Sequence, residues 1–241
     1  MPPEPVDDSG SPNVHAVLWD LDGTLIDSEG HWLAAEEATM AAHGLDWTKE
    51  DQQHCLGGPM ERVTQYMGEQ IAATTGKTVA SGVLADELLT RMSDELINSP
   101  PSFSPGAKSL LAALTQHGIP MALVTASHRQ LLDALAHSVD LHAFTTTIAG
   151  DEVERTKPDP MPYLEAARRL GVNIKDCVVL EDSPTGVAAA QASGAMVVAI
   201  PHMADISPGP RRHIVSSVCE ISVDWLNSLM RHEGTDGKRD H

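Results

Sequence analysis

A D-L-D-G-T motif at residues 20–24 carries the first side chains that are suited to chemistry. It follows the apolar run at 14–19, which predicts a buried strand that ends in a turn. In an open α/β sheet, ligands bind at the carboxyl edge of the strands, where this motif would lie. Asp20 and Asp22 can share one face of an extended segment, and a bound cation would relieve their mutual repulsion. An ordinary D-G turn with Thr24 as a helix cap explains the same residues equally well.

Two further residues have types that suit a phosphate group. Thr125 follows the apolar run at 121–124, and its hydroxyl can donate a hydrogen bond to a phosphoryl oxygen. A threonine in that place can also be the N-cap of the following helix. Lys157 precedes Pro158, which favours an extended backbone, and its ammonium can neutralise a bound phosphate. Most Lys-Pro pairs on protein surfaces are simply turns.

An E-D-S-P motif at residues 181–184 ends another apolar run. Ser183 is suited to cap a helix, and Pro184 is suited to its first position. The carboxylates of Glu181 and Asp182 are suited to a metal ion. A helix cap and a metal site are compatible at this motif.

The elements that must position these residues alternate along the chain. The later apolar runs are each preceded by a helical pattern, which is the order expected of a parallel sheet. Several helical patterns end at a glycine, which suits a left-handed C-cap. The expected strands are 14–19, 121–124, 177–180 and 196–200, with 145–149 as a further one, and the expected helices are 107–117, 129–137, 160–170 and 184–193.

Residues 31–99 differ from the rest because they are helix-like and almost free of strand signals. We interpret them as a helical cap inserted into a core formed by residues 14–30 and 100–230. The proline-rich stretch that follows the cap predicts a return linker, since proline cannot continue a helix. The acidic, proline-rich residues 1–13 and the polar residues 231–241 are expected to be a disordered arm and a disordered tail.

The composition limits the possible functions. Sixteen Lys and Arg against thirty-four Asp and Glu give a formal charge of -18, which disfavours nucleic acid and anionic lipid as partners. The same charge would repel a phosphate ester, so a phosphate site would need a metal ion or well-placed cations. Three widely spaced cysteines without a C-x-x-C pair, and the lack of an apolar run long enough to span a membrane, favour a cytoplasmic protein.

Four segments together resemble the ordered motifs of the haloacid dehalogenase superfamily. They are VLWDLDGTLIDSE, ALVTAS, KPDPMPYLEAARRLGV and VVLEDSPTGVAAAQASGA, and they extend from residue 14 to about residue 201. Agreement of four motifs in order is far more specific than a match to any one of them. The resemblance implies an α/β fold, with a Rossmann-like parallel sheet as its core and an α-helical cap inserted after the first motif.

The resemblance also implies a role for each motif residue. Asp20 would attack phosphorus, whereas Asp22 would protonate the leaving oxygen and then deprotonate the water that cleaves the aspartyl-phosphate. Thr125, Ala126 and Lys157 would hold and neutralise the transferring phosphoryl group.

The cofactor that the resemblance implies is Mg²⁺. Its ligands would be the Asp20 carboxylate, the Asp22 backbone carbonyl and Asp182. Glu181 would be a further ligand or a partner of the ligands, and water would complete the octahedron. The metal and Lys157 would make the local potential positive in an acidic protein.

The choice of reaction depends on the second aspartate. Dehalogenases similar to this family lack it because a halide needs no proton, so Asp22 favours a phosphatase. A phosphosugar mutase resembling beta-phosphoglucomutase is the main alternative, and a non-catalytic binding protein is the other. The mutases have a histidine at the position of Trp32 and a basic residue in the cap loop, where this chain has Glu61 unless Arg62 takes the place. The candidate substrate contacts are Trp32, Gly57, Gly58 and Arg62.

The sequence as a whole therefore predicts a Mg²⁺-dependent phosphomonoester hydrolase. Its partner would be a small phosphorylated metabolite such as a sugar phosphate, because the DSEGHW segment, which contains Trp32, resembles sugar-phosphate phosphatases of the same branch. The chain is expected to be a monomer or a weak dimer.

Overall fold

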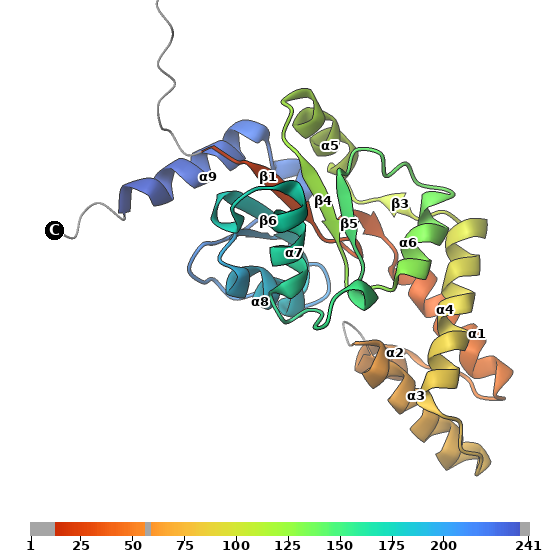
Figure 1. The fold of residues 1–241 in the computed structure, drawn as a ribbon. Helices are drawn as coiled ribbons and strands as arrows, with labels where there is room; N and C mark the ends of the chain where they lie inside the picture. The colour runs from red at the N-terminus through yellow and green to blue at the C-terminus, as the bar shows by residue number, and fades with distance from the viewer. Residues whose placement is uncertain (1–12, 56–58, 237–241) are drawn as a thin grey trace, which may run out of the picture.

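The computed structural model of the chain describes residues 13–55 and 59–236. A parallel six-stranded sheet forms the core of the fold (Figure 1). Its strands are β1 (Ala16–Trp19), β4 (Met121–Val124), β5 (Thr146–Ile148), β6 (Cys177–Glu181), β7 (Met196–Ala199) and β8 (Arg212–Ile214). Their order across the sheet is β5-β4-β1-β6-β7-β8.

Helices cover both faces of this sheet, because successive side chains of a strand point to opposite sides. In β1, Ala16 and Leu18 belong to the apolar cluster shared with α7 (Met161–Leu170) and α8 (Pro184–Ser193). Val17 and Trp19 belong to the cluster on the other face. The helices of that second face are α5 (Ala107–Gln116), α6 (Arg129–Ala136) and α9 (Val223–Asp236).

The pairing of the central strands brings their carboxyl ends to one edge. Trp19, the last residue of β1, is paired with Leu123 of β4 and with Leu180 of β6. The residues that follow these three strands therefore lie next to one another, although more than a hundred positions separate some of them in the chain.

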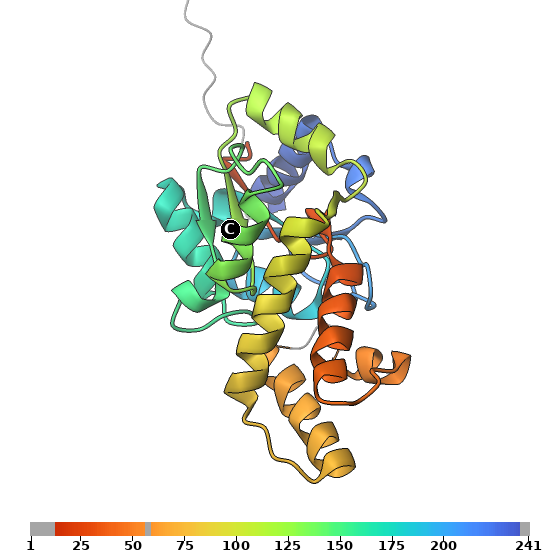
Figure 2. The same ribbon diagram turned by 90° about the vertical axis from the view of Figure 1, so that its right-hand side faces the viewer.

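Four helices form the cap: α1 (Glu29–Ala42), α2 (Lys49–Cys55), α3 (Met60–Thr75) and α4 (Ser81–Asn98). Figure 2 shows α1 and α4 running side by side, with α2 and α3 at the far end of the cap. Leu84, Leu88, Met92 and Leu96 recur every four residues along α4 and are buried, as expected of one face of a helix that packs on its neighbours.

A two-stranded antiparallel ribbon connects the cap to the core. Its strands, β2 (Ile26–Asp27) and β3 (Ser102–Phe103), are the two segments through which the chain enters and leaves the cap. A second contact joins α4 of the cap to α6 of the core, where Gln130 Nε2 donates to Ser93 Oγ over 3.1 Å. The ribbon and the α4–α6 contact both hold the cap against the core.

The predicted fold class, a Rossmann-like parallel core with an inserted helical cap, is confirmed. The prediction did not include the short strands β2, β3 and β8 or the helix α9. Helix α9 extends to Asp236, into the range 231–241 that was expected to be a disordered tail. Residues 1–12 of the expected arm lie outside the described residues. In the part of the chain that the structure describes, every helix is too short or too polar to cross a lipid bilayer.

Candidate active site

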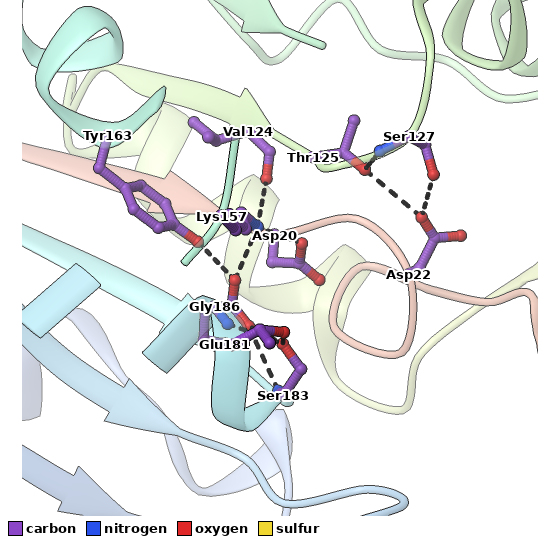
Figure 3. Close-up of polar contacts among 11 residues, drawn as sticks. Asp20, Asp22, Val124, Thr125, Ser127, Lys157, Tyr163, Glu181, Ser183 and Gly186 are labelled. Carbon is purple, nitrogen blue, oxygen red and sulfur yellow. Dashed lines mark hydrogen bonds and ion pairs between the residues drawn. The ribbon is translucent and has the colours of Figure 1, made fainter. Parts of the chain in front are cut away.

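The polar residues predicted from the sequence meet at the carboxyl edge of β1, β4 and β6. Figure 3 shows Asp20, Thr125 and Glu181 around one region, with Lys157 between the strands that carry them. Asp20 is 6 % exposed, Thr125 1 % and Glu181 0 %, so this is a buried polar cluster in an otherwise apolar region. Buried charges of this kind require partners.

Lys157 joins the parts of this cluster. Its Nζ donates to Asp20 Oδ1 and to Glu181 Oε1, both over 2.6 Å, and to the carbonyl oxygen of Val124 over 2.9 Å. Burial alone would lower the pKa of Lys157, but the Asp20 and Glu181 carboxylates outweigh that effect and raise it above its usual value. The charged form of Lys157 is therefore favoured beside Asp20 and Glu181.

Glu181 is held at both of its oxygens. Oε1 accepts from Lys157 and, over 2.6 Å, from the Tyr163 hydroxyl. Oε2 accepts from the backbone N–H of Ser183 and from its hydroxyl, over 3.3 and 3.1 Å. A Cβ added at Gly186 would lie 1.8 Å from Oε1, so α8 can approach the carboxylate only because residue 186 is glycine. Glu181 therefore fixes Lys157 relative to α8.

Ser183 has a second function as a helix cap. Its hydroxyl accepts a hydrogen bond from the backbone N–H of Gly186 over 3.0 Å, and Pro184 occupies the first helical position. The helix-cap interpretation of the E-D-S-P motif is therefore confirmed.

Three carboxylates converge around the Lys157 ammonium. Ligand oxygens of Asp20, Glu181 and Asp182 all lie within 4.8 Å of one another. Burial, followed by the Glu181 charge, raises the pKa of Asp20 well above its usual value and that of Asp182 to about 7. Asp182 packs against Gly23, where a Cβ would meet its Oδ2 at 2.2 Å. Hard oxygen donors with an excess of negative charge fit a divalent cation such as Mg²⁺.

Asp22 lies apart from Asp20 and Glu181, beside Thr125 and Ser127 (Figure 3). Its Oδ1 accepts from the hydroxyl of Ser28 over 2.6 Å and from Trp32 Nε1 over 3.3 Å. Its Oδ2 accepts from the hydroxyls of Ser127 over 2.8 Å and of Thr125 over 3.4 Å. The two aspartates of the first motif therefore have different surroundings and are suited to different tasks.

Thr125 and Ala126 lie where β4 turns towards α6. The Thr125 hydroxyl accepts from the backbone N–H of Ser127 over 2.9 Å, so it shapes the turn as well as contacting Asp22. Ala126 is exposed, and its carbonyl oxygen is 2.2 Å from where a Cβ of Gly150 would be. The small residue at 150 thus allows the turn to pack closely against the next loop.

The candidate substrate contacts of the cap are brought to different places. Trp32 is half-buried and contacts Asp22. Arg62 is exposed at the start of α3, and its Nη2 donates to the carbonyl oxygen of Cys55 over 3.3 Å. Gly57 and Gly58 lie outside the described residues.

Three contacts at the site were not anticipated from the sequence. Tyr163 binds Glu181, and Ser28 and Ser127 bind Asp22. All three residues lie inside the motifs that resemble the family, so their positions indicated that they are near the site. Their residue types alone do not show which way the side chains point.

A cavity of about 270 Å³ opens between the cap and the core. Its lining residues are Glu29, Lys49, Gln52 and Gln53 of the cap and Met203 of the core. Glu29 follows directly after Ser28, the residue that donates to Asp22, and its carboxylate lies 3.6 Å from His202 of the core. The cavity therefore lies where the beginning of α1 meets the core, and its lining contains neither Asp22 nor Ser28.

Comparison with known proteins relates this site to one family. The family described as "Haloacid dehalogenase-like hydrolase" matches residues 17–200. Hexitol phosphatase A of Escherichia coli (strain K12) is 33% identical over 78% of this chain and 83% of its own length. The Arabidopsis thaliana bifunctional riboflavin kinase/FMN phosphatase is also 33% identical, over 89% of this chain but only 53% of the relative, so the chain spans about half the length of that protein.

Solved structures agree with the sequence comparison. Two structures of CbbY from Rhodobacter sphaeroides, one in complex with phosphate and one of a mutant in complex with xylulose-(1,5)bisphosphate, have a TM-score of 0.73 and 26% identity to this chain. Each alignment covers 86% of this chain and 96% of the CbbY chain. The family match covers most of the chain, and the fold has the helical cap inserted into the core. The chain therefore belongs to the haloacid dehalogenase-like hydrolase family, in its helical-cap branch.

Proposed function

We propose that this protein is a phosphatase that hydrolyses the phosphate monoester of a small hydroxylated metabolite, with Asp20 as the nucleophile. The observation that carries the proposal is the contact of Lys157 with Asp20 inside a cluster of three carboxylates. A buried ammonium beside a buried carboxylate can bind a phosphate dianion and hold the attacking oxygen next to it.

The reaction has two steps in this proposal. In the first, an Asp20 oxygen bonds to phosphorus, the bond from phosphorus to the leaving oxygen breaks, and Asp22 in its acid form gives that oxygen a proton, so an alcohol leaves. In the second, water bonds to phosphorus and gives a proton to the Asp22 carboxylate, and the bond to Asp20 breaks. The products are inorganic phosphate and the original Asp20 carboxylate.

The other residues of the site hold the phosphoryl group. Lys157 neutralises its charge, the Thr125 hydroxyl donates a hydrogen bond, and the turn at Ala126 lies beside them. Glu181 keeps the lysine in place, because its oxygens are already engaged by Lys157, Tyr163 and Ser183. Its role in this proposal is to position the ammonium.

Asp20 and Asp182 would hold Mg²⁺, together with the backbone carbonyl of Asp22. When bound, the ion would neutralise the carboxylates and the developing negative charge on the phosphoryl oxygens. Glu181 would not bind the ion itself but would position the residues around it, since both of its oxygens accept hydrogen bonds in the structure.

The proposed substrate is a polyol or sugar phosphate. The names of the relatives support this class, as hexitol phosphatase A and the CbbY complex with a sugar bisphosphate both indicate. The cavity between cap and core supports it too, because its amide and charged side chains suit a hydroxylated leaving group. Trp32, which donates a hydrogen bond to Asp22, occupies the position where similar mutases have a histidine. The absence of that histidine favours hydrolysis over transfer to a second hydroxyl.

The test is a panel of polyol, sugar and aryl phosphates assayed with Mg²⁺ for release of inorganic phosphate. Asp20→Asn should lose at least about 10³-fold in kcat, since it removes the nucleophile, while its melting temperature stays close to that of the wild type. Formation of a phosphosugar isomer without phosphate release would instead show a mutase. Wild-type turnover by Asp20→Asn would contradict the proposed nucleophile.

A further inference from the structure

Asp22 is held by donors from two parts of the molecule. Ser28 and Trp32, on one of its oxygens, belong to the segment that begins the cap. Thr125 and Ser127, on the other oxygen, belong to the loop after β4 in the core. The direction of this carboxylate therefore depends on cap and core together.

Trp32 is unusual among these donors. An indole has a single donor and no acceptor, so its N–H can serve either Asp22 or a ligand but not both. Trp32 lies in the first turn of α1, is half-buried and packs against the main apolar cluster. Because its ring is fixed by that packing, the N–H is aimed at Asp22 Oδ1 by a rigid element rather than by a mobile side chain.

We propose that Trp32 is a positioning residue, whose indole N–H aims Asp22 at the leaving oxygen of the substrate. The inference rests on the role of Asp22 in the proposed function. Without the indole donor, the Asp22 carboxyl keeps Ser28 as its cap-side partner and loses one of the contacts that fix its angle. Proton transfer to the leaving oxygen should then suffer, since a general acid must lie within hydrogen-bond reach of the atom it protonates.

The test compares esters that differ in their need for that proton. An alkyl phosphate releases a strongly basic alkoxide, whereas p-nitrophenyl phosphate releases a weakly basic phenolate. For Trp32→Phe, which keeps an aromatic ring, kcat/KM should fall by about tenfold on alkyl phosphates and by less than about twofold on p-nitrophenyl phosphate. A plot of log kcat/KM against leaving-group pKa should therefore be steeper than that of the wild type.

Trp47→Phe is the matched control. Trp47 is also in the cap, and its Nε1 donates over 2.9 Å to the buried carboxylate of Glu36, which is not part of the site. This variant loses the same kind of hydrogen bond and has the same ring change, so any general loosening of the cap will appear in it. Its dependence on the leaving group should match that of the wild type.

Each outcome separates the inference from the proposed function. A uniform fall of kcat/KM for Trp32→Phe across all esters would show a packing or substrate-binding role and overturn the inference. Equal steepening in Trp47→Phe would overturn it as well. Failure of the wild type to hydrolyse any ester would instead remove the proposed function on which the inference rests.

Discussion

Buried acids of this protein have two kinds of surroundings. Glu181 is matched by the Lys157 ammonium and the Tyr163 hydroxyl, and its role follows from those contacts. Glu36, in α1 of the cap, is 8 % exposed and accepts a hydrogen bond from Trp47. The neighbouring charge that acts on its pKa is that of another acid, Glu37, which raises it further. Burial raises the pKa of Glu36 to about 7.

Glu36 should make the stability of the protein depend on pH. Its pKa is higher in the folded state than in the unfolded chain, where it is near the usual 4.5, so the folded state binds the proton more tightly. Stability is therefore lost as pH rises from about 4.5 to about 7. Glu36→Gln keeps an acceptor for Trp47 and cannot ionise.

The measurement is urea unfolding of both proteins at saturating Mg²⁺. The free energy of unfolding of Glu36→Gln, relative to that of the wild type, should rise by about 2 kcal/mol between pH 5 and pH 8. The exposed neighbour provides a control, since Glu37→Gln should show no such gain. Parallel pH profiles for Glu36→Gln and the wild type would contradict the prediction.

The motif residues of the site were identifiable from the sequence because each follows a strand or begins a helix. Asp20, Thr125 and Glu181 were placed at strand ends by apolar runs alone, and the family resemblance supplied their roles. Tyr163 could not be assigned in this way. Its hydroxyl comes from α7, and nothing in the sequence of that helix shows that the side chain points towards Glu181. Contacts between distant segments depend on packing that spacing does not encode.

Helix α8 and strand β6 meet at one very close contact. Gly186, in the first turn of α8, lets the helix rest on the Glu181 carboxylate at the end of β6. Gly186→Ala should destabilise the protein by about 1–3 kcal/mol through overpacking. It should also lower kcat, because a displaced Glu181 no longer fixes Lys157.

A helical glycine without neighbours gives the contrast. Among the described residues, and apart from its chain neighbours and the backbone of its own helix, no heavy atom lies within 4 Å of a Cβ built at Gly82 in α4. Gly82→Ala should therefore stabilise the protein by about 0.5–1 kcal/mol. Thermal unfolding of the two variants, read beside their kcat values, checks both predictions. Equal effects at the two positions would show that the contact with Glu181 is not tight in solution.

Elements were predictable where burial dictates the sequence. Strand β4 and helix α8 begin and end where the pattern placed them, since a strand buried on both faces reads as a continuous apolar run and a glycine ends the helix. Strand β8 was missed because Arg212, His213 and Ile214 are partly or fully exposed at the sheet edge. Its pairing comes from backbone hydrogen bonds, which any side chain permits.

At the scale of the whole molecule, the cavity between cap and core should select the leaving group. Lys49 lines this cavity from α2, so Lys49→Met should raise KM for a polyol phosphate by about threefold and leave kcat nearly unchanged. Kinetics with p-nitrophenyl phosphate, which lacks the hydroxyl groups, should not change. Lys77→Met, beyond the end of α3, is the control, and equal KM shifts in both variants would point to the net charge of -18 instead.

The ribbon of β2 and β3 has a consequence for the ancestry and engineering of this protein. Because Ile26 is paired with Phe103, the chain departs from the core and comes back to it at neighbouring backbone positions. Everything between them is a cassette with adjacent ends, which can be cut out and replaced by another without moving the strands that carry Asp20 or Thr125. A chimaera joined at this ribbon should keep the Asp20 and Lys157 of its core and take the selectivity of the inserted cap, provided that the new cap supplies donors to Asp22 in place of Ser28 and Trp32.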